Sequence, residues 1–558
     1  GGEGGGGGGG GPRWGGGRDV TRGGAIGRIG VLRGGAAARF GSGTVAGVIN
    51  VVLRRGEGGR LESGAGAGAG GAEVVWAAGE YGGEWGGGWF SVAADARDRA
   101  VVFPEGESRE VPHEPAAQEL GLAINGGVRM GGVEVYGFGV VGGWRSETVG
   151  RYRASGEGAA PLYPTGYRPR IVSDVVDAGG AVGARGRWGA WEWDAFARVG
   201  GSVVALGARN TLNLSMGSSS PTSFDAGTLR ASGAAVTLEV SRRLEGMMGV
   251  PLGITGRVEI QRESYGIEAG DEASYVDGGA AGLPGLRPRD AVAAAQTAVV
   301  AALSFDAAVA SALHLVVSGH LRDDEASDDP MAGQAAVRWS PAPWVRVHGG
   351  VATGYRVPSL RERHFSWTSV RGEGEAGQRE VRVRPAGAGT LGRERVGHAG
   401  GGVALLPAPG IVAAVDYART TVGGRVVLSG AVPVTGEWAV RSFSNALDTE
   451  TRALDATASL DTAVLGGRVR LSLGASWTRT RVVEVGAGAI NSVEVEWIEE
   501  AVPALGAILG VDYRRGAFRA TLGNRYHGAA SAFDLGAGRL LPLAGGWVTD
   551  LLASWTYA

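Results

Sequence analysis

The residues best suited to ligand binding lie in one long polar segment, RERHFSWTSVRGEGEAGQREVRVR, residues 361–384. Guanidinium groups bind anions through charge-assisted hydrogen bonds, and they also stack on aromatic rings. The segment therefore predicts contacts with an anionic or aromatic ligand, and the candidates are Arg361, Arg363, His364, Phe365, Trp367 and Arg371. The alternative is a solvated external loop that packs on itself, because loops accumulate such residues in any case.

Other polar groupings point less clearly to chemistry. An acidic cluster could bind Ca²⁺ at a hairpin tip, but it lacks the spacing of a dedicated calcium loop; its members are Asp323, Asp324, Glu325, Asp328 and Asp329. His314 and His320 lie on one face of an expected strand, where they fit a polar lumen. No nucleophile elbow of the G-x-S-x-G type joins a strand to a helix. We therefore expect no metal site, no cofactor and no enzymatic activity.

Composition excludes several further classes. The chain has no cysteine, which removes disulfide scaffolds and thiolate chemistry, and all 54 basic residues are arginine, which removes P-loops and Schiff-base lysines. A net charge of −2 provides no general attraction for nucleic acid. The 105 glycines disfavour long helices, and no apolar run is long enough for a helical membrane span. An all-β protein fits these features best.

The elements that must position the polar segment are short runs of alternating polarity. From Val469 to Trp477, Val, Leu, Ala and Trp occupy one face, and Arg, Ser and Gly occupy the other. The run from Trp191 to Val199 alternates likewise, with Phe196 as an apolar residue on the polar face. Aromatic residues near strand ends are typical of membrane interfaces, and the candidates are Trp191, Trp193, Trp477, Trp555 and Tyr557.

Connections between these runs differ in length. Short ones include SPAPW (340–344), LPAPG (406–410) and DYRRGA (512–517), whereas long ones cover residues 210–227, 268–288 and 356–395. Short turns at one end and long loops at the other are typical of outer-membrane barrels. The sequence thus predicts a large antiparallel transmembrane β-barrel of about 22 strands, a number that fits plugged transporters.

The segment IGRIGVLRGGAAARFGSGTVAGVINVVLRR, residues 26–55, resembles the closing part of the plug domain of TonB-dependent outer-membrane receptors. Further stretches resemble one receptor subfamily in chain order, among them ATGYRVPSLRE (352–362) and SFSNALDTETRALD (442–455). Residues 1–25 form a Gly-rich low-complexity N-terminus. After it, the resemblance implies a C-terminal plug remnant at 26–55 inside the lumen and a receptor barrel at 56–558. It also implies that Arg33, Gly34, Gly41, Ser42, Gly43 and Asn50 hold the plug against the barrel.

As a member of this family, the chain would be a monomer in the outer membrane of a Gram-negative-type bacterium, in contact with membrane lipid and lipopolysaccharide. It would take up a scarce nutrient with energy from the TonB complex, although the coupling box itself has no counterpart in this chain. A siderophore-type metal chelate is the favoured ligand, with cobalamin or an oligosaccharide as alternatives. Two alternative hypotheses remain open: a passive or non-functional barrel with an incomplete plug, and a soluble all-β binding protein.

Overall fold

The structure is a computed structural model of the whole chain. It describes residues 25–33, 47–55, 57–68, 73–100, 115–150, 152–155, 161–245, 250–324, 331–371, 379–385, 391–430, 432–435, 438–486, 489–534 and 539–556. No helix among these residues is long and apolar enough to cross a membrane.

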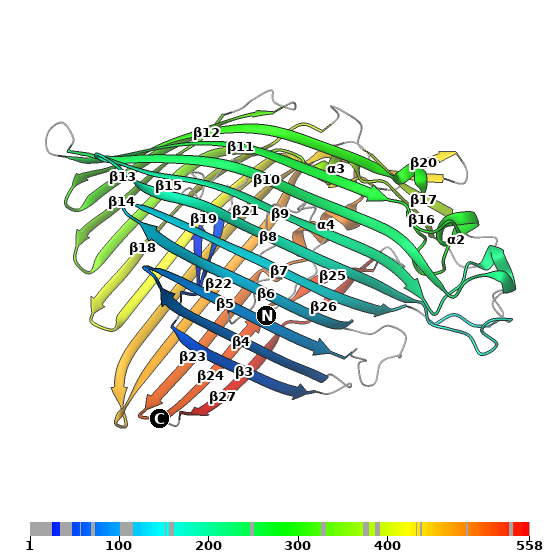
Figure 1. Ribbon diagram of the computed structural model, residues 1–558, viewed down its shortest axis with the longest axis horizontal. Helices are drawn as coiled ribbons and strands as arrows, with labels where there is room; N and C mark the ends of the chain where they lie inside the picture. Colours follow the sequence, from blue (N-terminus) through cyan, green and yellow to red (C-terminus); the bar gives the residue numbers. More distant parts are fainter. Residues whose placement is uncertain are drawn as a thin grey trace.

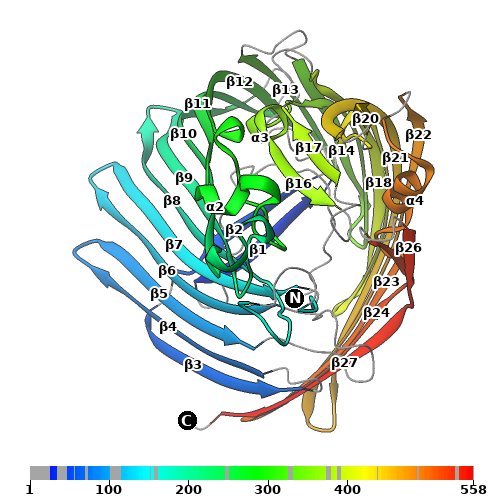
Figure 2. The ribbon, with the colours of Figure 1, turned by 90° about the vertical axis from the view of Figure 1, so that its right-hand side faces the viewer.

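One closed barrel contains nearly all the strands (Figures 1 and 2). Its strands are β3 (Gly58–Ala67), β4 (Glu73–Trp85), β5 (Gly88–Arg99), β6 (Ala116–Met130), β7 (Val133–Val149), β8 (Arg170–Trp188), β9 (Trp191–Arg209), β10 (Ser223–Glu245), β11 (Pro251–Glu268), β12 (Val292–Ala310), β13 (Leu313–Asp324), β14 (Met331–Ala342), β15 (Val345–Arg356), β16 (Trp367–Arg371), β17 (Arg379–Arg384), β18 (Glu394–Ala408), β19 (Ile411–Leu428), β20 (Val432–Thr435), β21 (Trp438–Val464), β22 (Gly467–Val485), β23 (Leu505–Arg515), β24 (Phe518–His527) and β27 (Gly546–Trp555). The predicted antiparallel barrel of about 22 strands is confirmed.

Alternation of side chains gives the barrel an apolar outer face and a polar lumen. On β22, Leu471 and Leu473 face outward, and Leu473 is 52% exposed. Arg470 faces the lumen and donates hydrogen bonds to Asp461 of β21 (2.8 and 2.9 Å). Phe196 lies on the lumen face opposite Gly183 of β8, which has no side chain to compete for that space. Period-two patterning thus decides which face each residue takes.

Connections alternate in length as predicted. β14 and β15, β18 and β19, and β23 and β24 are joined by tight turns. Gly516 supplies a positive φ of 54° in the last of these turns, a backbone conformation that side chains disfavour. The other end of the barrel carries longer connections with short helices, which are η3 (Leu214–Ser219), α2 (Glu272–Tyr275), η5 (Val276–Gly278), η6 (Pro288–Asp290), α3 (Leu360–His364) and α4 (Ser492–Glu500). A separate hairpin joins β25 (Ala530–Asp534) and β26 (Arg539–Leu543).

A second antiparallel hairpin, β1 (Ile26–Arg33) with β2 (Gly47–Leu53), lies inside the barrel (Figure 2). It corresponds to the predicted plug remnant. The two strands pair from Arg33 with Gly47 to Ile26 with Leu53. The hairpin therefore places the chain segment before the barrel within the lumen.

Four of the five predicted interface aromatics lie in described strands. Trp191, Trp193 and Trp555 lie beside the tight turns, and Trp191 and Trp555 are 38% and 61% exposed. Trp477 lies on the same outward face as Val469, farther toward the long loops. Tyr557 falls outside the described residues. Their contact with a membrane interface stays a prediction.

Candidate functional site

Three long connections pack together at one end of the barrel, and we call them the loop cap: the described parts of 210–222, 269–291 and 357–393. Figure 2 shows α2, α3, β16 and β17 of this cap reaching across the barrel opening. Two apolar clusters hold the cap to the wall. One contains Phe224, Ala280 and Leu283, and the other contains Ile267, Leu286 and Leu360. Trp367 packs against both clusters and so connects them.

Buried polar side chains fix the backbone of the cap. Asn213 is fully buried, and its side-chain amide donates to the carbonyls of Ala273 (2.9 Å) and Val276 (2.8 Å). The Ser366 hydroxyl donates to buried Asp290 (2.5 Å), which also accepts from the Arg287 amide (3.1 Å). Because a buried polar group without a partner is costly, these bonds favour one arrangement of the three loops.

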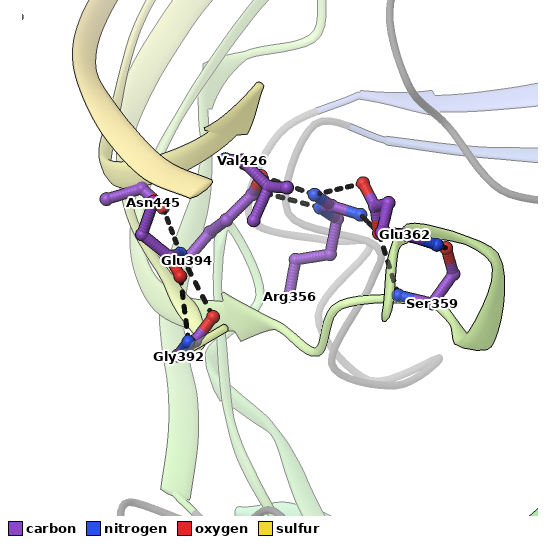
Figure 3. Close-up of polar contacts among 8 residues, drawn as sticks. Arg356, Ser359, Glu362, Gly392, Glu394, Val426 and Asn445 are labelled. Atoms are coloured by element: carbon purple, nitrogen blue, oxygen red, sulfur yellow. Dashed lines mark hydrogen bonds and ion pairs between the residues drawn. The ribbon is translucent and has the colours of Figure 1, made fainter. Parts of the chain in front are cut away.

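Arg356 links the cap to the barrel rim (Figure 3). At the end of β15, its guanidinium donates two hydrogen bonds of 2.9 Å to Glu362 of α3 and forms a second ion pair with Glu394 of β18. The Ser359 hydroxyl caps α3 by accepting from the Glu362 amide (3.2 Å), and the Val426 amide donates to Glu394 (2.8 Å). Both carboxylates are almost fully buried. This ion-pair network fixes where α3 lies.

The predicted ligand-contact residues take different positions in the loop cap. Phe365 and Trp367 pack in the apolar part of the cap, and the Trp367 indole donates to the Pro284 carbonyl (3.2 Å). Arg361 is exposed, with its guanidinium 5.6 Å from the centre of the Phe365 ring. Arg371 pairs through its backbone with Arg379, and its side chain is outside the description. Ligand contact by all six residues stays a prediction.

Arg363 and His364 lie partly buried on α3. Burial lowers the pKa of Arg363, and neighbouring Arg322 lowers it further, while Asp324 and Glu263 oppose the shift. One guanidinium nitrogen of Arg363 is buried without a hydrogen-bond partner. Burial also lowers the pKa of His364, followed in effect by the charge of Arg363. Arg363 therefore combines partial burial with one guanidinium nitrogen that can still donate a hydrogen bond.

Two residues of the predicted acidic cluster lie in the described part of the chain. Asp324 accepts from Arg322 (2.6 Å) and lies 3.5 Å from Arg393, so its carboxylate is neutralised by arginine. Glu325, Asp328 and Asp329 fall outside the described residues. Within the described ranges, no group of three or more His, Asp or Glu residues could hold a metal ion.

Of the predicted plug-seating residues, only Arg33 and Asn50 lie in described segments. Asn50 pairs with Gly30 inside the hairpin, and the Arg33 side chain is not described. Gly34, Gly41, Ser42 and Gly43 fall outside the described residues. Their role stays a prediction.

Among the described residues, the two arginines that follow β2 contact the barrel wall. Arg54 forms an ion pair with Glu80 of β4, and its carbonyl accepts from Asn125 of β6 (3.4 Å). The Arg55 guanidinium lies 4.6 Å from the centre of the Trp89 ring.

The sequence interpretation missed Arg54, Arg55, Arg356 and Glu394. Adjacent arginines at the end of the strand NVVLRR were a usable signal, because an enclosed arginine requires a partner. Glu394 gave no such signal, since its partners lie 32 and 38 residues away in the chain.

The model of the family "TonB dependent receptor-like, beta-barrel" matches residues 126–557. Among solved structures, the siderophore receptor PirA of Acinetobacter baumannii is similar with a TM-score of 0.72 and 12% identity, covering 96% of this chain and 79% of that chain. A variant of the ferric enterobactin receptor PfeA of Pseudomonas aeruginosa gives 0.69 and 15%, with 96% and 78% covered. The iron transporter FrpB of Neisseria meningitidis gives 0.67 and 13%, with 95% and 80% covered. A search of curated proteins found no match.

Proposed function

Because this chain belongs to the TonB-dependent receptor family, we propose that it is an outer-membrane receptor that captures a siderophore-type metal chelate and admits it through the barrel. The observation that carries the proposal is the loop cap, which holds Arg361 and Arg363 at the barrel opening on a helix fixed by Arg356. Siderophore and iron receptors among the structural neighbours support the same ligand class.

Chelates that bind Fe³⁺ through carboxylate or catecholate oxygens commonly carry net negative charge. Arginine forms charge-assisted hydrogen bonds with such oxygens, and a partly buried guanidinium gains more from an anion than one in bulk water. The partly buried Arg363, with one unsatisfied nitrogen, and the exposed Arg361 fit this chemistry. Passage through the lumen would require rearrangement of the plug segment, for which the TonB complex is the expected energy source.

The test measures binding of ferric chelates to the purified protein in detergent, and the change in tryptophan fluorescence reports the binding. We expect an anionic ferric tricatecholate to bind, and Arg363→Gln to weaken binding by about tenfold, the effect of one charge-assisted hydrogen bond. Arg470→Gln is the matched control, because Arg470 pairs with Asp461 near the tight turns, far along the strand from the cap. Preference for a neutral oligosaccharide or for cobalamin, with no effect of Arg363→Gln, would contradict the chelate assignment.

A further inference from the structure

A groove of about 730 Å³ crosses the outer wall of the barrel over β6–β11, strands that lie side by side in Figure 1. We call it the outer-wall groove. It follows a row of directly paired residues on successive strands, Ile124, Gly139, Gly180, Val199, Ala234 and Arg262. Glycine and alanine leave space on the sheet surface, while the larger side chains border it.

The row faces the membrane and not the lumen. Ile124 and Val199 are 52% and 61% exposed. Their neighbours in sequence point the other way: Ala123 is buried, and Asn125 donates to the Arg54 carbonyl of the plug segment inside the barrel. A cavity on this face is therefore filled from the lipid side.

The two ends of the groove differ in polarity. Ile124 and Leu122 form the apolar end on β6. At the other end lie Arg262 and a hydrogen-bonded hydroxyl pair, Ser232 and Ser264 (2.7 Å). The polar end is the one near the long loops, because β11 ends at Glu268 and continues into the loop cap. The groove thus runs from the external surface into the hydrocarbon.

Arg262 differs from other arginines on the outward face. Arg145 pairs with Asp174, and Arg230 pairs with Glu268. Arg262 is exposed, and it donates a hydrogen bond to the neutral Thr297 hydroxyl (3.3 Å). At a lipid surface such a cation gains from an anionic headgroup.

The dimensions suit a fatty-acyl chain. Six strands give five inter-strand spacings of roughly 4.8 Å, or roughly 24 Å along the row. Strands of outer-membrane barrels tilt by roughly 35–45°, so a row across them descends by roughly 14–17 Å over this length. This depth matches the roughly 15 Å that one leaflet contributes to the hydrocarbon core.

We propose that the outer-wall groove binds one acyl chain of lipopolysaccharide, with a phosphate of its lipid A headgroup at Arg262. The orientation selects this lipid: a phospholipid of the inner leaflet would bring its phosphate toward Leu122 and Ile124, the apolar end. The inference rests on the outer-membrane location in the proposed function, but not on the chelate.

Native mass spectrometry of the purified full chain with added lipid A tests the proposal, with phosphatidylglycerol as the comparison lipid. Arg262→Gln removes the cation, and Ala234→Phe fills the groove from an exposed position that already carries a Cβ. We expect each to lower lipid A affinity by about tenfold. The matched controls are Ala301→Phe, on the outward face of β12 outside the groove, and Arg452→Gln, which pairs with Glu450 on another part of the wall.

All variants are first checked for folding by heat-dependent migration in detergent gels. Loss of lipid A binding in both groove variants and retention in both controls supports the site. Unchanged lipid A binding in either groove variant overturns it, and phosphatidylglycerol binding of equal strength overturns the choice of lipid. Chelate binding measured on the same variants separates the two proposals, because a failure of chelate binding leaves lipid binding unaffected.

Discussion

Arg356 shares one guanidinium between two nearly buried carboxylates, so its removal leaves two negative charges close together without a counterion. Breaking a buried ion pair by removing one partner costs about 3–5 kcal/mol. We predict that Arg356→Gln releases α3 from the rim, and that hydrogen exchange of residues 359–368 rises strongly while the barrel strands stay protected. Arg470→Gln, which removes an exposed ion pair, serves as the control. Unchanged exchange at α3 would show that apolar packing alone holds the helix.

His364 makes the packing of α3 sensitive to pH. Its pKa lies below the ordinary value near 6.5, mainly because of burial, so the packed state binds fewer protons than the released state. Above pH 6.5 His364 is neutral in both states and does not weaken the packing of α3. As pH falls below 6.5, its protonation increasingly favours the released state. We predict that hydrogen exchange of residues 360–368, corrected for intrinsic rates, increases between pH 7 and pH 5. In His364→Gln this extra increase should disappear; persistence of the same pH dependence would assign it to another group.

At the scale of strands, alternation on β22 gives an internal control at adjacent positions. Leu473 faces lipid, and a charged residue near the middle of a membrane-facing strand costs about 2–4 kcal/mol. Gly474 faces the lumen, and a Cβ added there meets no atom within 4 Å. We predict that Leu473→Arg lowers stability by that amount in denaturant titrations of the refolded protein, whereas Gly474→Arg has little effect. Equal effects would mean that the two faces of the strand are equally accessible to water.

The same alternation explains why the barrel could be predicted from the sequence. Each strand decides locally which side chains face lipid, as between Val469 and Trp477, and tight turns such as that at Gly516 identify one end. Loop lengths then identified the other end. These signals need no knowledge of distant residues.

The loop cap could not be predicted in the same way. Asn213 bonds to carbonyls 60 and 63 residues away, and Ser366 bonds to Asp290 across 76 residues. Nothing in the local pattern selects these partners. Sequence reasoning therefore found the arginine-rich segment but not the packing that uses Phe365 and Trp367 to hold it.

At the scale of the whole molecule, the relation between the lumen hairpin and the wall depends on few described contacts. Arg54 pairs with Glu80, and Arg55 lies over Trp89, both just after β2. These contacts join the plug segment to β4 and β5, at the point where the chain enters the barrel. Loss of these contacts would free the base of the hairpin from β4 and β5.

We predict that Arg54→Ala/Arg55→Ala increases the frequency and size of current fluctuations in planar bilayers, relative to the unchanged chain. Arg28→Ala is the matched control, because Arg28 lies on β1 and is exposed. The barrel itself should be unaffected, so all three proteins should show the same heat-dependent migration in detergent gels. Identical current fluctuations in the double variant and the control would mean that the hairpin is retained by other contacts, and that Arg54 and Arg55 do not limit its movement. Larger or more frequent current fluctuations only in the double variant would identify this base as a restraint on movement of the plug segment.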